Sequence, residues 1–111
     1  MKKYLCVIEV KPECREEYIA IHKAPWPGML DAIHEAGYLN EVIWYYKDQS
    51  IIYLELPDDL PNEVADARLR ATDVCKQWDI TVCPWFSKDP AMPEKIFDLN
   101  QQRGGGALLP D

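Results

Sequence analysis

A phenol, an imidazole and an indole occur close together in residues 17–27. Tyr18 and His22 are four residues apart, so in a helix their side chains lie one above the other on the same face. Histidine titrates near neutral pH and can donate or accept a proton, and Trp26 offers a flat apolar surface. The stretch therefore indicates a site that binds a ring-shaped ligand and transfers a proton, although these residue types are also typical of an aromatic core.

These side chains need a helix that ends just after His22. Residues 13–23 combine good helix formers with early acidic residues and predict that helix. Residues 25–27, Pro-Trp-Pro, must interrupt it, because a proline removes a backbone donor and restricts the residue before it. A second helix is expected from Pro27 to Gly37, since glycine commonly follows a helix end. His34, near that end, is interpreted as structural.

The remaining elements are predicted from hydrophobic patterns and turn residues. Strands are expected at 3–10, 40–47, 51–56 and 94–99, the second and third joined as a hairpin. Helices are expected at 62–70 and at 73–78, with Thr72 as the N-cap of the latter. The order βαββαβ predicts an α+β fold of the ferredoxin-like type, an antiparallel sheet with helices on one face.

A chain of 111 residues suffices for one domain, which we expect at 1–100, followed by a flexible tail at 101–111. The strands carry more apolar surface than one layer of helices can cover, including Trp44, Tyr46 and Tyr53. We therefore expect a homodimer in which two sheets pack together.

The charge balance limits the possible partners. Twelve basic and nineteen acidic residues give a net charge of -7, which argues against binding to nucleic acid or to an anionic membrane surface. No apolar run has the length of a transmembrane helix, and Glu9 ends the first one too early for a signal peptide. The chain has four cysteines, Cys6, Cys14, Cys75 and Cys83, with neither CxxC nor zinc-finger spacing. We therefore expect reduced thiols in a cytoplasmic protein, and no metal site.

Two motifs together resemble those of the L-rhamnose mutarotase family. One is Tyr-x-x-x-His-x-x-x-Trp-Pro at 18–27, and the other is Thr-Asp-Val-Cys-x-x-Trp at 72–78. The resemblance covers most of the chain, from the first strand to Leu99. It implies a homodimer of the dimeric α/β barrel type. It also implies an isomerase without a cofactor that interconverts the α and β anomers of L-rhamnose or a related monosaccharide.

The resemblance also implies roles for three residues. His22 matches the family's proton donor, and Tyr18 and Trp78 match residues that contact the sugar. The chemistry agrees with these types, because opening a hemiacetal adds a proton to the ring oxygen and removes one from the anomeric hydroxyl. We therefore predict His22 as catalytic and Tyr18 and Trp78 as substrate-binding.

Two positions depart from the family pattern. Glu41 stands where the family commonly has a tyrosine, and Asp79 where it has a second tryptophan. Either both are solvated acids beside an unchanged site, or they contact the substrate and favour a more hydroxylated sugar or an amino sugar. Trp85 could replace the missing indole. Two other functions stay open, namely a cofactor-free monooxygenase on the same fold and a non-catalytic sugar-binding or interaction module.

Overall fold

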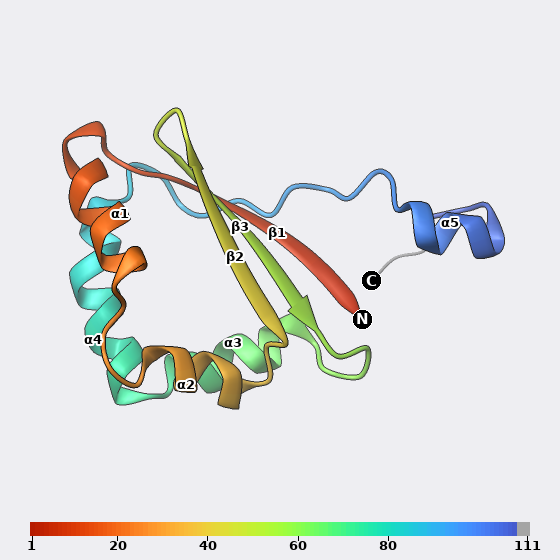
Figure 1. Ribbon diagram of the computed structural model, residues 1–111, viewed down its shortest axis with the longest axis horizontal. Coiled ribbons are helices and arrows are strands. Elements are labelled where there is room, and N and C mark those ends of the chain that lie inside the picture. The colour runs from red at the N-terminus through yellow and green to blue at the C-terminus, as the bar shows by residue number, and fades with distance from the viewer. Residues whose placement is uncertain (109–111) are drawn as a thin grey trace.

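A computed structural model of the chain describes residues 1–108 and has a three-stranded antiparallel sheet with four helices on one side of it (Figure 1). The elements follow in the order β1 (Lys2–Glu9), η1 (Pro12–Cys14), α1 (Arg15–Lys23), α2 (Met29–Ala36), β2 (Asn40–Tyr46), β3 (Gln49–Leu56), α3 (Asn62–Arg70), α4 (Asp73–Val82), η2 (Cys83–Trp85) and α5 (Leu99–Gly105). The α+β class and the antiparallel sheet with helices on one face are confirmed.

The strand order is β1-β3-β2, so β3 lies in the centre of the sheet. The hairpin between β2 and β3 is confirmed, and its loop consists of Lys47 and Asp48, with φ values of 49° and 60°. Two residues at positive φ form the type I′ turn whose twist matches that of paired strands.

The register of β2 decides which side chains face the helices. Tyr45 pairs with Ser50, and Ser50 bonds to Tyr18 of α1, so this row of the sheet faces the helices. Because side chains alternate along a strand, Glu41 and Ile43 face the helices with Tyr45. The opposite face of the sheet carries the alternate apolar residues: Leu5, Val7, Val42, Trp44, Tyr46, Ile51 and Tyr53.

Local signals set the helix ends. The proline break separates α1 from α2, which begins at Met29 after Gly28, two residues later than predicted. Gly37 ends α2 with a φ of 116°, which confirms the predicted helix end, and a Cβ there would overlap Leu60. The Thr72 hydroxyl caps α4 by accepting from Cys75 N at 3.3 Å, and α4 continues to Val82, beyond its predicted end.

The predicted fourth strand at 94–99 is wrong. Ile96 and Phe97 are 81% and 66% exposed, in a segment that runs away from the sheet (Figure 1). The outer edge of β1 is covered instead by the preceding segment, through Val7 N to Ala91 O at 2.8 Å and Ala91 N to Val7 O at 2.9 Å. The chain at 84–93 contains three prolines, and a proline cannot donate to a ladder, so the pairing stays at isolated bridges.

The predicted tail overlaps the short helix α5, which was not predicted. That helix begins at Leu99, and the carboxylate of the preceding Asp98 caps it by accepting a hydrogen bond from Gln101 N at 3.1 Å. Residues 109–111, the end of the predicted tail, lie outside the described residues.

Candidate active site

The helix-facing side of the sheet and helices α1 to α4 enclose an open cavity of about 1510 Å³. His22, Tyr18 and Trp78, the three predicted site residues, all line it. A smaller hollow of about 690 Å³ lies between β1, β3 and the C-terminal segment, and none of these three residues lines it. The larger cavity is therefore the candidate active site.

His22 lies in the last turn of α1, with Nδ1 2.7 Å from the carbonyl oxygen of Tyr18. A carbonyl only accepts, so Nδ1 carries the proton and Nε2 of the neutral ring keeps its lone pair. Burial holds the pKa of His22 below its ordinary value, opposed in part by the bond to Tyr18. At neutral pH the ring is therefore mainly an uncharged base.

Tyr18 packs its ring against that of His22, with centroids 4.3 Å apart, which confirms that the two side chains share one helical face. Only 2% of Tyr18 is exposed, and its hydroxyl donates to Oγ of the buried Ser50 at 2.7 Å. Burial raises the pKa of Tyr18 to about 12, with Ser50 acting in the opposite direction. Tyr18 therefore stays protonated at neutral pH and holds the imidazole in place.

Trp78 closes the other side of His22. Its ring meets the imidazole edge-on, at 5.2 Å and 88°, and meets Trp26 at 5.4 Å and 76°. Trp26 and Trp85 are not among the described residues that line the cavity. The indole of the proline break therefore supports Trp78 from behind, and Trp85 does not take the place of a cavity-lining indole.

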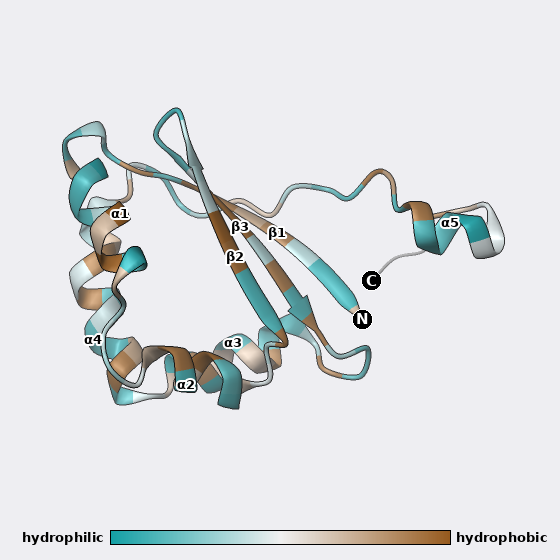
Figure 2. Cartoon of the chain, viewed as in Figure 1, coloured by the Kyte–Doolittle hydropathy of each residue, from teal (hydrophilic) through white to brown (hydrophobic). Residues whose placement is uncertain are grey.

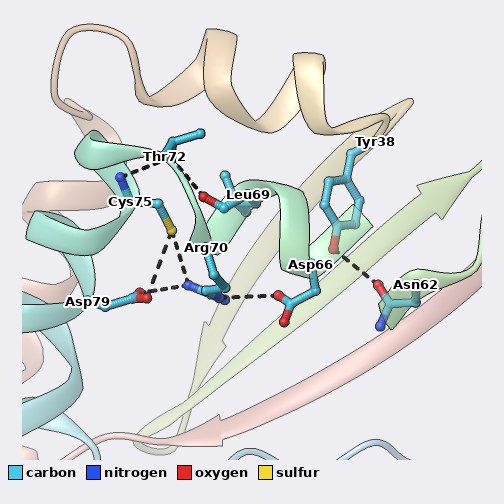
Figure 3. A network of polar contacts seen from close by, with 8 residues as sticks. All are labelled: Tyr38, Asn62, Asp66, Leu69, Arg70, Thr72, Cys75 and Asp79. Atoms are coloured by element: carbon cyan, nitrogen blue, oxygen red, sulfur yellow. Dashed lines mark hydrogen bonds and ion pairs between the residues drawn. The ribbon is translucent and has the colours of Figure 1, made fainter. Parts of the chain in front are cut away.

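Arg70, at the end of α3, ties that helix to α4 (Figure 3). Its Nε donates to Asp66 at 3.2 Å, and its Nη1 donates to Asp79 at 2.6 Å and to Cys75 Sγ at 3.3 Å. One guanidinium thus engages two carboxylates that line the cavity. This network was not predicted from the sequence. The network's one local signal is the four-residue spacing of Asp66 and Arg70, which is typical of a helical ion pair.

Glu41 has a different environment from Asp79, although both depart from the family pattern. It lies half-buried on the cavity side of β2. Over residues 1–108, no hydrogen bond or ion pair engages its carboxyl group; only its backbone N–H is bonded, to Asn40 Oδ1. Burial raises the pKa of Glu41, and the charge of Arg70 partly opposes this shift. Asp79 is thus a paired acid, whereas Glu41 presents a free carboxyl to the cavity.

The chain is similar to known proteins over most of its length. The family model for L-rhamnose mutarotase matches residues 3–101. The chain belongs to the L-rhamnose mutarotase family. It is 25% identical over 103 residues to the L-rhamnose mutarotase of Listeria monocytogenes serotype 4b, over 91% of this chain and 95% of the relative. Members of this family are isomerases that act on carbohydrates, and the chain is a sugar mutarotase by family.

Solved structures agree on the fold. The L-rhamnose mutarotase FA22100 from Formosa agariphila superposes with a TM-score of 0.68 at 12% identity, over 88% of this chain and 98% of that one. An antibiotic biosynthesis monooxygenase superposes with a TM-score of 0.61 at 13% identity, over 86% and 99%. The fold is thus shared by mutarotases and monooxygenases, and the family match separates them.

The thiols of this mutarotase family member are all free, and burial raises the pKa of Cys75. A raised pKa disfavours the thiolate, so Cys75 is unsuited to act as a nucleophile. Within residues 1–108, no three His, Cys, Asp or Glu side chains are grouped to hold a metal ion. The helices in the same part of the chain are too short or too polar to cross a membrane.

Proposed function

We propose that the chain interconverts the α and β anomers of L-rhamnose or a related monosaccharide without a cofactor, with His22 as the principal acid/base group. The observation that carries the proposal is the placement of His22 between Tyr18 and Trp78 on the wall of one large cavity. The bond from Nδ1 to Tyr18 O leaves Nε2 as the nitrogen that can exchange a proton.

Each neighbour of His22 supports a distinct part of sugar binding. Trp78 supplies an indole surface against which the apolar face of a pyranose can stack. Tyr18 already donates its proton to Ser50, so we infer that its oxygen accepts from a sugar hydroxyl. Asp79 is held by Arg70, which favours its reading as a paired acid beside the site.

The function is tested by NMR exchange between anomers. The protein is mixed with L-rhamnose and a panel of other aldoses, and magnetisation transfer between the two anomeric protons is measured against a protein-free sample. We expect exchange well above the spontaneous rate for at least one aldose. Methyl α-L-rhamnoside is the matched control, because its methylated anomeric oxygen prevents ring opening; it should bind without exchanging.

The alternatives predict other outcomes in the same samples. A sugar-binding module would show saturation transfer to an aldose with no gain in exchange. A monooxygenase would show neither, and would consume dioxygen with an aromatic substrate. Either result would contradict the proposed function.

We also propose that the protein is a homodimer that acts in the cytoplasm, with residues 1–100 as its single domain. The four free thiols support a reducing compartment. The sheet face opposite the cavity supports the dimer, since Trp44 and Tyr46 are 57% and 61% exposed there. Hydrophobic residues run through the middle of the strands (Figure 2). An apolar face of this extent is typical of a surface that packs against another protein.

Sedimentation velocity at micromolar concentration should therefore show a dimer. Trp44→Glu places a charge on the proposed interface and should shift the protein to the monomer. Ile80→Glu is the matched control, because Ile80 is 67% exposed on α4, away from the sheet; it should leave the dimer intact. A wild-type monomer, or equal behaviour of the two variants, would contradict sheet-to-sheet packing.

A further inference from the structure

We propose that Glu41 is the second proton-transfer group of the cavity, giving a proton to the ring oxygen of the sugar while His22 takes one from the anomeric hydroxyl. This inference rests on the proposed mutarotase function and adds the partner that His22 needs. A single base cannot open the ring efficiently, because the departing ring oxygen must be neutralised as the C–O bond breaks.

The position of Glu41 fits this role. It lies on β2 opposite Leu54 and shares the cavity-facing row with Ile43 and Tyr45. Its charge also acts on the pKa of Tyr18, the residue whose ring packs against His22. His22 and Glu41 thus approach a ligand in the cavity from the helix layer and from the sheet, respectively.

The other carboxyl groups of the cavity are less suited to donate a proton. Asp66 and Asp79 both bond to the Arg70 guanidinium, and an ion pair favours the charged, proton-free form of a carboxylate. Asp89 lies on the exposed segment after η2. Glu41 is the one acid lining the cavity, among the residues that the structure describes, that is both shielded from solvent and without a bonded partner.

Burial acts on the two proposed groups in opposite directions, and both changes help. It raises the pKa of Glu41 and lowers that of His22, so the pair is found more often as neutral acid plus neutral base. The groups that interact electrostatically with Glu41 are Cys6 of β1, Tyr18 of α1, Tyr38 before β2 and Arg70 of α3, and Asp66 of α3 acts on Cys6 and Tyr38 as well. Of these, Arg70 favours the charged carboxylate, and its two ion pairs with aspartates weaken that influence.

The proposed step is balanced. Nε2 of His22 accepts the proton of the anomeric hydroxyl, and the C1–O1 bond becomes the carbonyl of the open aldehyde. The C1–O5 bond breaks, its electron pair goes to O5, and O5 takes the proton of Glu41. After rotation about C1–C2, O5 attacks the other face of the carbonyl and returns its proton to the Glu41 carboxylate, while O1 recovers a proton from His22.

The pH dependence follows from the required forms. His22 must be neutral, so the rate should fall as the pH drops through its pKa. Glu41 must be protonated, so above the pKa values of both groups the rate should fall about tenfold per pH unit. A wild-type rate, corrected for spontaneous exchange, that is constant from about pH 7 to 9 would overturn the proposal.

The main test compares Glu41→Gln with Glu55→Gln, using L-rhamnose for exchange and methyl α-L-rhamnoside for binding. Glu55→Gln makes the same chemical change on the opposite face of the sheet. Glu55 follows Leu54, the residue of β3 that pairs with Glu41. We expect Glu41→Gln to slow exchange by about 10²–10³-fold, to lose the alkaline fall, and to bind the glycoside within a few-fold of wild type. Glu55→Gln should match the wild type in all three.

The outcomes separate this inference from the proposed function. If Glu41→Gln exchanges the sugar at the wild-type rate, the role of Glu41 is overturned and the mutarotase proposal stays intact. Absence of exchange in the wild type would overturn both. If Glu41→Gln proves unstable in thermal unfolding, Glu41→Asp is the second test, because it keeps the acid but shortens its reach. Glu41→Asp should retain part of the rate and the alkaline fall, and loss of both would count against the role.

Discussion

Replacing His22 by Asn should slow anomer exchange by about 10²–10⁴-fold, the usual contribution of a positioned acid or base. Asparagine keeps a polar side chain of similar size but cannot take up the proton that Nε2 accepts. Binding of methyl α-L-rhamnoside should change only a few-fold, because Tyr18 and Trp78 remain in place. The measurement is NMR exchange from about pH 5 to 9, in which the fall on the acid side should vanish in the variant and lie below pH 6.5 in the wild type.

The matched control is His34→Asn, which changes the second histidine of the chain. His34 also lines the cavity, but it is exposed near the end of α2 and has neither the Tyr18 contact nor the Trp78 contact of His22, in agreement with its interpretation as structural. It should exchange the sugar at the wild-type rate. Equal rates for wild type and His22→Asn would show that the proton is moved by another group, and Glu41 would then be the first alternative.

Replacing Trp78 by Ala should lower the free energy of unfolding by about 3–5 kcal/mol, the usual loss for a buried tryptophan. Trp78 is 8% exposed and packs between His22 and Trp26, so its removal leaves a void in the core and frees the imidazole on one side. Such a loss is a large part of the stability of a typical domain, about 5–15 kcal/mol. Urea denaturation at pH 7 measures it.

Ile80→Ala controls for shortening a large side chain on the same helix. Ile80 is 67% exposed, so its change should lie within about 0.5 kcal/mol of wild type. Trp78→Phe retains an aromatic ring and should recover most of the stability. If Trp78→Ala unfolded at the same urea concentration as Ile80→Ala, Trp78 would not be part of the core that positions His22.

Local signals in the sequence were sufficient for much of the fold. The Thr72 cap, the stop at Gly37 and the helix at 62–70 each depend on the chemistry of a few neighbouring residues, and each was predicted. The alignment of Tyr18 over His22 follows from helical spacing alone. The fourth strand was wrong because Ile96 and Phe97 have strand-like types but no neighbouring strand, which their local sequence does not reveal.

The site was predictable only in part for a similar reason. The partner of Arg70 on α4 depends on how two helices pack, and no short spacing in the sequence brings Arg70 and Asp79 together. The difference between Glu41 and Asp79 has the same origin. Both are acids at unusual positions, and only the fold gives one a guanidinium partner and leaves the other facing the cavity.

The strand order β1-β3-β2 also bears on the solubility of the protein. The irregular segment that covers β1 blocks further pairing there, whereas β2 has no neighbouring strand on its outer side within residues 1–108. An uncovered strand edge can template edge-to-edge aggregation, and proteins commonly protect such edges with lysine or proline. Residues 40–46 contain neither, but they include the inward-facing Glu41, and the net charge of -7 also disfavours non-specific association of copies.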